Sequence, residues 1–390
     1  MYCCIIVKSL LDFFSYIRSV NIAINTRFLL SEKMEGFGWF TFEITKRMVL
    51  SHPEHTFYFF FDRIYDEKFV FAKNVKPIVL KPQARHPILF KIWFNYSVTK
   101  ALTKYNIDLF FSPDGYLSLK SNVKQVGVIH DLNFEHYPQD IPLWPRVYLR
   151  TNFRKFAKKA THLITVSEYS KQDIVSLYGI NPSKITVAYN AASEYFKIIE
   201  DSDKVEVRKR YTHGTSYFVY VGAIHKRKNI NRLIKAFQLF KRNTKSNTKL
   251  LIVGENLWSN ESKFDKQLKS DILFTGHVKI DELSKIVGSA KALCLVSYFE
   301  GFGIPLVEAM QAGVPLIAGN KTALPEISGD AAILVDPFSV EDIANGLFQL
   351  DRDESLRKGL IEKGLARSKS FNWQKSADLI WCEIDRLTKK

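Results

Sequence analysis

The chain of 390 residues is poor in cysteine, which occurs only at positions 3, 4, 294 and 382. Cys3 and Cys4 are adjacent, which is not the spacing of zinc ligands, and Cys294 lies in an apolar run that we expect to form a buried strand. The sequence therefore predicts neither a disulfide framework nor a metal site. We expect the protein to work in a reducing compartment.

Acidic residues are few relative to basic ones, since 40 Asp and Glu face 56 Lys and Arg and leave a net charge of +16. Such a charge indicates an anionic partner, which could be nucleic acid, an anionic membrane or a phosphorylated substrate. No nucleic-acid-binding motif supports the first of these. The chain also lacks low-complexity segments and solenoid repeats, and it is too long for one core, so we expect two domains.

The sequence lacks an apolar run long enough to cross a bilayer. Residues 1–19 come closest, because five apolar side chains share one helical face, but charged residues interrupt the segment. The first charge follows the start of the apolar stretch, which argues against a signal peptide. Three interpretations stay open: an interfacial helix on a membrane, an extension that packs on the fold, or a start codon assigned too far upstream.

Turn and helix signals are concentrated in residues 297–319, SYFEGFGIPLVEAMQAGVPLIAG. The preceding run, Leu293 to Val296, has the length and composition of a strand. Pro305 suits the first turn of a helix, and Gly313 is expected to end that helix. A helix N-terminus preceded by glycines offers unpaired backbone N–H groups and a partial positive charge, so it attracts phosphate.

Two carboxylates flank this glycine loop, Glu300 before it and Glu308 one turn inside the helix. Carboxylates do not favour phosphate binding, because both groups are negatively charged. We therefore expect the carboxylates to accept hydrogen bonds from hydroxyl groups beside the phosphate, such as those of ribose or a sugar. The segment predicts a site for a nucleotide that carries a sugar.

Glu300 and Glu308, separated by seven residues with GFG after the first, resemble the paired-glutamate motif of retaining GT-B glycosyltransferases, in particular family 4. The resemblance covers roughly Val20 to the C-terminus. It implies an α/β fold of GT-B type, in which two Rossmann-like domains face each other across a cleft and a C-terminal helix crosses back to the N-terminal domain. Family members usually begin at the first strand, here Val20 to Asn25, so residues 1–19 are a departure.

The periodicity supports this organisation, because β-rich apolar runs alternate with helical stretches in both halves, as in parallel sheets covered on both faces. A charged stretch without apolar period indicates the linker. The expected domains are an extension at 1–19, an acceptor-binding domain at 20–196, a linker at 197–215, a nucleotide-sugar-binding domain at 216–371 and a crossover helix at 372–390.

Two sites are expected in the N-terminal half. Gly36 and Gly38 follow the first strand, but their spacing is not that of a dinucleotide fingerprint, so an ordinary turn explains them equally well. The resemblance implies that they let the donor diphosphate face this domain. His130 ends the strand Val126 to Ile129, at the edge where open α/β sheets bind ligands. A lone histidine is more often structural, yet the segment VGVIHDLNFEHYP resembles the family's His-Asp segment, which implies that His130 lies near the donor sugar.

A basic helix is expected from Pro142 to Ala160, with Arg146, Arg150, Arg154 and Lys158 on one face. This face is either a solvated surface or a patch that holds acceptor phosphate or anionic headgroups.

The C-terminal half opens with a second basic cluster. The loop GAIHKRKN places Lys226, Arg227 and Lys228 after an expected strand, where their charge would neutralise a leaving nucleoside diphosphate. A charge run is otherwise often a solvated face. The resemblance implies that Arg227 and Lys228 grip the donor phosphates, although this chain has Ala223 where many members carry arginine.

By the same resemblance, Glu308 would hold the ribose hydroxyls and Glu300 a hydroxyl of the donor sugar. The implied catalytic residues are His130, Arg227, Lys228 and Glu300. The implied donor-binding residues are Gly36, Gly38, Gly301, Phe302, Gly303, Ile304 and Glu308. We expect no metal and no cofactor, since basic groups and a helix N-terminus would neutralise the leaving group, and we identify no conventional general base.

The resemblance implies a metal-independent retaining enzyme that moves a hexose from GDP-mannose or a UDP-hexose to a glycan or lipid-linked acceptor. It would serve cell-envelope polysaccharide synthesis in the cytoplasm, either free or peripheral at the inner face of the membrane. The alternatives are a nucleotide-sugar epimerase or phosphorylase of the same architecture, or a catalytically silent sugar-nucleotide-binding or membrane-docking protein. A phosphorylase would need a lysine-bound cofactor, and an epimerase would need additional carboxylates in the N-terminal cleft.

Overall fold

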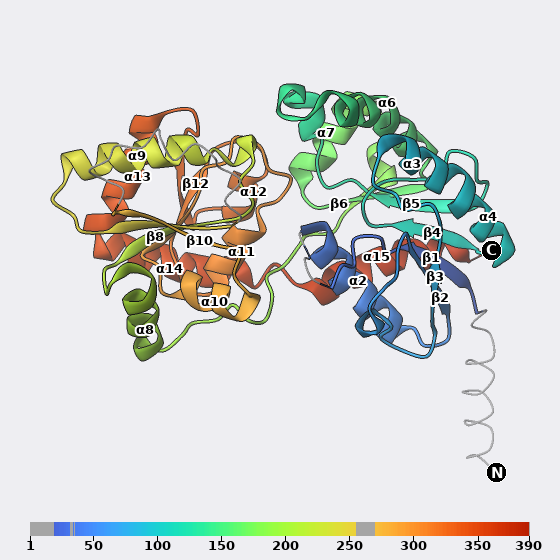
Figure 1. The fold of residues 1–390 in the computed structure, drawn as a ribbon, viewed down its shortest axis with the longest axis horizontal. Helices are drawn as coiled ribbons and strands as arrows, with labels where there is room; N and C mark the ends of the chain where they lie inside the picture. Colours follow the sequence, from blue (N-terminus) through green and yellow to red (C-terminus); the bar gives the residue numbers. More distant parts are fainter. Residues whose placement is uncertain (1–18, 32–33, 35, 255–269, 390) are drawn as a thin grey trace, which may run out of the picture.

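The computed structural model describes residues 19–31, 34, 36–254 and 270–389, which form two domains, each built on one parallel sheet (Figure 1). The segment 1–18, for which three interpretations were open, lies outside the described residues. Among the helices of the described ranges, none has the length and apolar character that a bilayer span requires.

The N-terminal domain contains a seven-stranded sheet in the order β3-β2-β1-β4-β5-β6-β7, in which every neighbouring pair is parallel. Its strands are β1 (Asn21–Asn25), β2 (Thr56–Phe61), β3 (Val75–Val79), β4 (Leu109–Ser112), β5 (Lys124–Val128), β6 (His162–Thr165) and β7 (Ile185–Val187). Its helices are α2 (Gly36–Ser51), α3 (Pro87–Ile92), α4 (Thr99–Lys104), α5 (Asn133–His136), α6 (Leu143–Lys159) and α7 (Glu168–Tyr178), and a π-helical segment (Trp93–Val98) joins α3 to α4.

The C-terminal domain contains a six-stranded parallel sheet in the order β10-β9-β8-β11-β12-β13. Its strands are β8 (Tyr217–Val221), β9 (Lys249–Val253), β10 (Ile272–Gly276), β11 (Ala292–Leu295), β12 (Leu316–Gly319) and β13 (Ala332–Val335). Its helices are α8 (Asp201–Thr212), α9 (Ile230–Asn243), α10 (Ile280–Gly288), α11 (Ile304–Gln311), α12 (Leu324–Ser328), α13 (Val340–Arg352) and α14 (Glu354–Ser368), with a short 3-10 turn at Lys226–Lys228.

Continuous apolar runs form the central strands because helices cover both faces of each sheet. The sequence ALCL of β11 is buried along its whole length, as are the strands β4, β6, β8 and β12. Cys294 is buried in β11, as the sequence predicted. The loops at the carboxyl ends of these strands therefore project from a buried sheet.

Both sheets reverse their winding direction at one point, between β1 and β4 in the N-terminal sheet and between β8 and β11 in the C-terminal sheet. Loops diverge at such a point and leave a crevice at the carboxyl ends of the strands. The basic turn 226–228 follows β8, and the Glu300 loop follows β11. The topology therefore brings these two sequence motifs to the same crevice.

The last helix, α15 (Trp373–Thr388), confirms the predicted GT-B architecture, because it leaves the C-terminal domain and packs on α2 and β4 (Figure 1). The Oγ1 of Thr186 donates to Glu383 (3.0 Å), and the ring of Trp381 stacks on His52 with 3.7 Å between centroids. The predicted crossover of this helix is therefore confirmed.

Two segments differ from the sequence-based expectation. A helix, α8, forms at Asp201–Thr212, where we expected charged chain without an element. Acidic residues in its first turn and basic residues in its last turn complement the helix dipole, a signal that apolar periodicity does not report. Gly36 and Gly38 lie in the first turn of α2 and not in a loop before it.

Candidate active site

The centre of the candidate site is a three-residue charge cluster. The Oε1 of Glu300 lies 2.6 Å from the Nζ of Lys228, and its Oε2 lies 2.7 Å from a guanidinium nitrogen of Arg227. Glu300 is 4% exposed. Burial alone would raise the pKa of Glu300, but Lys228 and Arg227 together lower it to about 2. The cluster is therefore an ionised carboxylate held between two cations, with one positive charge in excess.

Backbone contacts fix the relative position of the two loops that carry this cluster. Asn229 ends the basic turn in a left-handed conformation (φ 61°), and its side-chain amide donates to the carbonyls of Val296 (3.0 Å) and Pro337 (2.6 Å). The backbone N–H of Tyr298 donates to the carbonyl of Arg227 (3.0 Å). The basic turn and the glutamate loop consequently form one unit, which explains why Lys228 and Glu300 meet across 72 residues of sequence.

The helix after the loop begins at Ile304 and follows Gly303, whose φ of 99° is in the region that favours glycine. Gly313 ends the helix with a φ of 68°, as predicted. Glu308 projects from this helix and is half-buried. Burial raises the pKa of Glu308 to about 8, and its carboxyl group has no hydrogen-bond or ion-pair partner among the residues that the structure describes. The two predicted glutamates thus have opposite environments.

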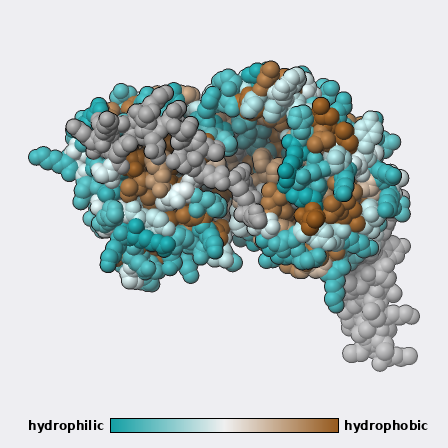
Figure 2. All heavy atoms as spheres, viewed as in Figure 1, coloured by the Kyte–Doolittle hydropathy of each residue, from teal (hydrophilic) through white to brown (hydrophobic). Residues whose placement is uncertain are grey.

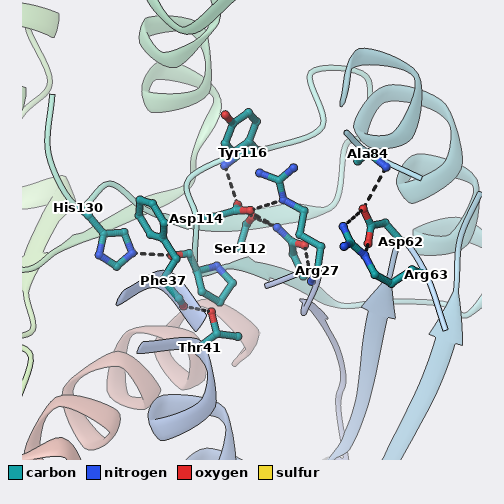
Figure 3. Close-up of polar contacts among 12 residues, drawn as sticks. Arg27, Phe37, Thr41, Asp62, Arg63, Ala84, Ser112, Asp114, Tyr116 and His130 are labelled. Atoms are coloured by element: carbon teal, nitrogen blue, oxygen red, sulfur yellow. Dashed lines mark hydrogen bonds and ion pairs between the residues drawn. The ribbon is translucent and has the colours of Figure 1, made fainter. Parts of the chain in front are cut away.

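His130 follows β5 and faces the glutamate loop from the N-terminal domain. Its Nε2 lies 2.7 Å from the carbonyl of Pro113, and its ring packs edge-on against Phe37 (Figure 3). The ring also packs edge-on against Phe40. Since a carbonyl only accepts, Nε2 carries the proton and Nδ1 keeps its lone pair. Burial lowers the pKa of His130 despite that hydrogen bond. The imidazole is therefore neutral, with Nδ1 available as an acceptor.

Gly301 brings the two domains into direct contact. A Cβ built on Gly301 would overlap the carbonyl oxygen of His130 and approach the Cβ of Asp131 to 2.8 Å. The Oγ of Ser167 donates to the carbonyl of Gly301 (2.7 Å), and the Oγ of Ser170 donates to the carbonyl of His130 (3.0 Å). The structure therefore places the predicted residues of the two halves, His130 and the Glu300 loop, at one interface.

Other predicted residues lie differently. Phe302 is buried and packs on Phe371, with 5.6 Å between ring centroids, so its side chain belongs to the core. A Cβ on Gly38 would lie 2.8 Å from the carbonyl oxygen of Phe28, which gives this glycine a packing reason for its small size. Gly36 has no heavy atom within 4 Å of a built Cβ. The roles of these residues toward a donor stay predictions.

An ion pair that the sequence did not predict lies at the switch point of the N-terminal sheet. Arg27, after β1, contacts the Oδ2 of Asp114, after β4, through its Nε at 2.6 Å, and both are buried (Figure 3). Asn25 donates to the same carboxylate (2.9 Å), and the guanidinium lies 4.4 Å from the ring centroid of Tyr116. Arg27 and Asp114 each lie two positions beyond the end of a strand, β1 or β4, and this position was the available signal.

The sequence also gave no sign of a second interdomain contact, at the N-terminus of α7. The backbone N–H groups of Glu168 and Tyr169 donate to the two carboxylate oxygens of Glu326, each at 2.9 Å. A carboxylate suits the positive end of a helix. Tyr298 and Asp140 form a further hydrogen bond between the domains. In the described conformation the two domains are therefore joined by hydrogen bonds of Glu326 and of Tyr298, in addition to the contact at Gly301.

The basic face predicted on α6 is partly used within the domain. Arg150 pairs with Glu135 at 2.9 Å, and Arg146 donates to the carbonyl of Pro138 (3.3 Å). Arg154 and Lys158 are exposed.

Two family profiles match most of the chain. Residues 36–193 match the profile described as Glycosyltransferase Family 4, and residues 202–367 match the one described as Glycosyl transferases group 1. The two matches follow the division into two domains.

Similar proteins agree with this assignment. The chain is 26% identical to O-antigen chain mannosyltransferase B of Escherichia coli over 87% of this chain and 93% of that protein. It is 26% identical to O-antigen chain mannosyltransferase RfbU of Salmonella typhimurium over 70% of this chain and 74% of that protein. The fold is similar to that of Anabaena HepE in complex with UDP and glucose (TM-score 0.72, 17% identity, 94% of this chain and all of that one). The chain therefore belongs to glycosyltransferase family 4 and is a glycosyltransferase of GT-B fold.

Proposed function

We propose that the protein is a retaining mannosyltransferase that transfers mannose from GDP-mannose to a lipid-linked glycan of the cell envelope, on the cytoplasmic side of the membrane. The relatives from Escherichia coli and Salmonella typhimurium, both named O-antigen chain mannosyltransferases, support mannose as the sugar and a polysaccharide as the product. The site itself supports a nucleotide-sugar donor.

The observation that carries the proposal is the contrast between the two glutamates. Glu300 is already saturated by two cations, whereas the half-buried carboxyl group of Glu308 has no partner in the described chain. A buried polar group without a partner is unfavourable unless a ligand supplies one. The paired hydroxyls of a ribose would donate to Glu308 and relieve this cost, which fits a nucleotide next to α11.

The charge cluster is suited to the departure of a nucleoside diphosphate. Arg227 and Lys228 together outweigh Glu300 by one positive charge, so an incoming diphosphate competes with that carboxylate for the same two cations. Glu300, once released from one of them, accepts a hydroxyl of the donor sugar. As the bond between sugar and phosphate breaks, the two cations and the N-terminus of α11 stabilise the charge that grows on the leaving oxygen.

The donor sugar and the acceptor hydroxyl would be held between His130 and the leaving phosphate. His130, which is neutral, would accept a hydrogen bond from a sugar hydroxyl at Nδ1 and thereby orient the ring. The leaving phosphate oxygen would take the proton of the acceptor hydroxyl on the face from which it departs, and the anomeric configuration would be retained. Protein cations, and no metal ion, would neutralise the phosphate.

An epimerase of the same fold is less well supported, because the carboxylates near His130 are engaged. Asp114 pairs with Arg27, and Asp131 accepts the backbone N–H of Asn133 (3.0 Å). A second candidate is transfer from a UDP-hexose, which the likeness to HepE, solved with UDP and glucose, favours.

The test is thermal stabilisation by GDP, UDP and ADP, measured for the wild type, for Glu308→Gln and for the control Glu362→Gln on the exposed face of α14. We expect GDP to stabilise the wild type and the control, by roughly 2.7 kcal/mol at a hundredfold excess over its Kd, and to have little effect on Glu308→Gln. Preference for UDP would select the second candidate. If no nucleotide stabilised the wild type at millimolar concentration, the cleft would not be a donor site.

An assay of sugar transfer then tests the reaction and its stereochemistry. Incubation of radiolabelled GDP-mannose with envelope membranes should yield labelled glycan, and NMR of the product should show the anomeric configuration of the donor. Turnover should persist in EDTA. Bound nucleotide without transfer to any glycan would indicate a catalytically silent binder.

A further inference from the structure

Positive charge is concentrated in two segments of the N-terminal domain that contain no acidic residue. Residues 68–107 carry eight Lys and Arg with no Asp or Glu, and residues 141–167 carry six with none. These segments hold α3 and α6, which pack together through Phe90 and Tyr148 (5.8 Å between ring centroids), both next to Tyr116. The two acid-free segments therefore meet where α3 packs on α6.

Large apolar side chains are exposed on the same two helices. On α6, Trp144 is 73% exposed and Val147 is 47% exposed, and Leu143 is exposed beside them. On α3, Ile88 is 64% exposed, and Ile92 is exposed one turn later. In Figure 2, hydrophobic side chains gather among hydrophilic ones over the region that holds α3 and α6 in Figure 1. We call these residues, with the exposed Lys91, Arg154, Lys155 and Lys158, the α3–α6 face.

A solvated basic surface does not explain this face, because five large apolar side chains are exposed on it beside the cations. Tryptophan and aliphatic side chains beside lysine and arginine suit the boundary of an anionic bilayer, where the apolar groups enter the headgroup layer and the cations meet lipid phosphates. The carboxylates next to this face do not repel an anionic bilayer, because both have partners within the protein. Glu135 is paired with Arg150, and Asp140 is hydrogen-bonded to Tyr298.

We propose that the α3–α6 face docks the protein on an anionic lipid bilayer. Its charge and its exposed apolar groups are the observations that select this occupant. Docking goes beyond the transfer reaction and does not depend on the identity of the donor.

The position of the face gives docking a consequence for the site. Asp140, three residues before α6 begins, contacts Tyr298, two residues before Glu300. A bilayer at Trp144 and Val147 therefore lies next to the segment that contacts the glutamate loop. If the acceptor is lipid-linked, as the proposed function states, docking brings its hydroxyl to the donor without extraction of the lipid.

The experiment is flotation of the full-length protein with vesicles of phosphatidylcholine, alone or mixed with phosphatidylglycerol, at low and high salt. Two variants change the face, Val147→Asp and Lys155→Glu. Each has a matched control on α8 in the other domain, Val205→Asp at an exposed valine and Lys209→Glu at an exposed lysine.

We expect the wild type and both controls to float with the anionic vesicles and not with vesicles of phosphatidylcholine alone. Flotation with the anionic vesicles should decrease at high salt. Each face variant should partition at least about tenfold more weakly. All four variants should bind nucleotide as the wild type does, which separates loss of docking from loss of the donor site.

Three outcomes would overturn the proposal. The face variants could float as well as the wild type, or the α8 controls could lose partitioning to the same degree. Alternatively, the protein could ignore vesicles and bind oligonucleotides in a way that Lys155→Glu abolishes, which would assign the face to nucleic acid.

Discussion

The backbone of Gly301 lies against the carbonyl oxygen of His130, in a space that no larger residue can occupy without movement of the backbone. Gly301 precedes the helix that carries Glu308, and His130 follows strand β5 of the opposite domain. The hydroxyl of Ser167 bonds to the same glycine. This contact sets how closely the two halves of the site approach.

Substitution of Gly301 should therefore disturb catalysis more than folding. In Gly301→Ala, the added methyl group pushes the glutamate loop away from His130, and a displacement of about 1 Å at a reacting centre can lower the rate by roughly a hundredfold. We expect kcat to fall by that order, with a melting temperature close to that of the wild type. Steady-state kinetics and calorimetry measure both quantities.

The control is Gly359→Ala in α14, where a built Cβ meets no atom within 4 Å. It should keep wild-type kcat, and the higher helix propensity of alanine should leave it slightly more stable. Wild-type kcat in Gly301→Ala would show that the loop accommodates a methyl group and that the interdomain approach is not limiting.

Loss of Lys228 should reduce turnover strongly and leave the fold intact. In Lys228→Ala, Glu300 keeps Arg227 as a partner, so the carboxylate stays paired, but the excess positive charge of the cluster is gone. A group that stabilises charge in the transition state typically contributes a factor of about a hundred to a thousand in kcat. Lys226→Ala is the matched control, because Lys226 is exposed in the same turn. Near-normal turnover of Lys228→Ala would remove this lysine from the site.

The local parts of this site could be read from sequence. The glycine loop, the helix stop at Gly313 and the basic turn depend on residue types a few positions apart, and the structure reproduces them. The strands could be predicted equally well, because burial on both faces of the sheet requires a continuous apolar sequence.

The residues that these groups contact could not be predicted from sequence, because the order of the strands in the sheet determines which distant residues meet. Arg27 and Asp114 meet across 87 residues only because β1 and β4 are neighbours in the sheet. The packing role of Gly301 depends on the closure of two domains, which no local pattern encodes. Helix α8 was missed because charge at its ends, and not an apolar stripe, marks it.

Glu308 should make the stability of the protein depend on pH. Its pKa is 4.5 in the unfolded chain and about 8 in the folded one, so the folded state binds more protons between these values. Its contribution to the free energy of unfolding is therefore lost as pH rises from about 4.5 to about 8, and stays lost above. Allowing for partial solvent access, we expect a loss on the order of 2 kcal/mol. Glu308→Gln should abolish this component, which urea unfolding at a series of pH values measures.

The same carboxyl group should couple nucleotide binding to proton release. Ribose hydroxyls stabilise the ionised form of Glu308, so the pKa of Glu308 falls on binding, and near neutral pH a proton leaves the protein. Calorimetric titrations in buffers of different ionisation enthalpy should show proton release for the wild type and none for Glu308→Gln, measured at nucleotide concentrations that saturate the weaker site of the variant. Equal proton release in both proteins would mean that another group accepts the ribose hydroxyls.

The buried pair of Arg27 and Asp114 should behave as one unit. Arg27→Met leaves the carboxylate of Asp114 buried with neutral donors only, and loss of one partner of a buried ion pair costs about 3 to 5 kcal/mol. Asp114→Asn leaves a buried guanidinium surrounded by the rings of Tyr116, Phe28 and Phe90, which disperses its charge in part. We therefore expect Asp114→Asn to be the less damaging single change.

The double variant tests the coupling. Because both charges are then absent, Arg27→Met with Asp114→Asn should be less destabilised than the sum of the two single changes, by at least about 1 kcal/mol. Urea unfolding of all four proteins completes the cycle. Strict additivity would mean that the two side chains act independently, and that the loops after β1 and β4 are held in place by Asn25, Ser112 and the aromatic rings without help from the ion pair.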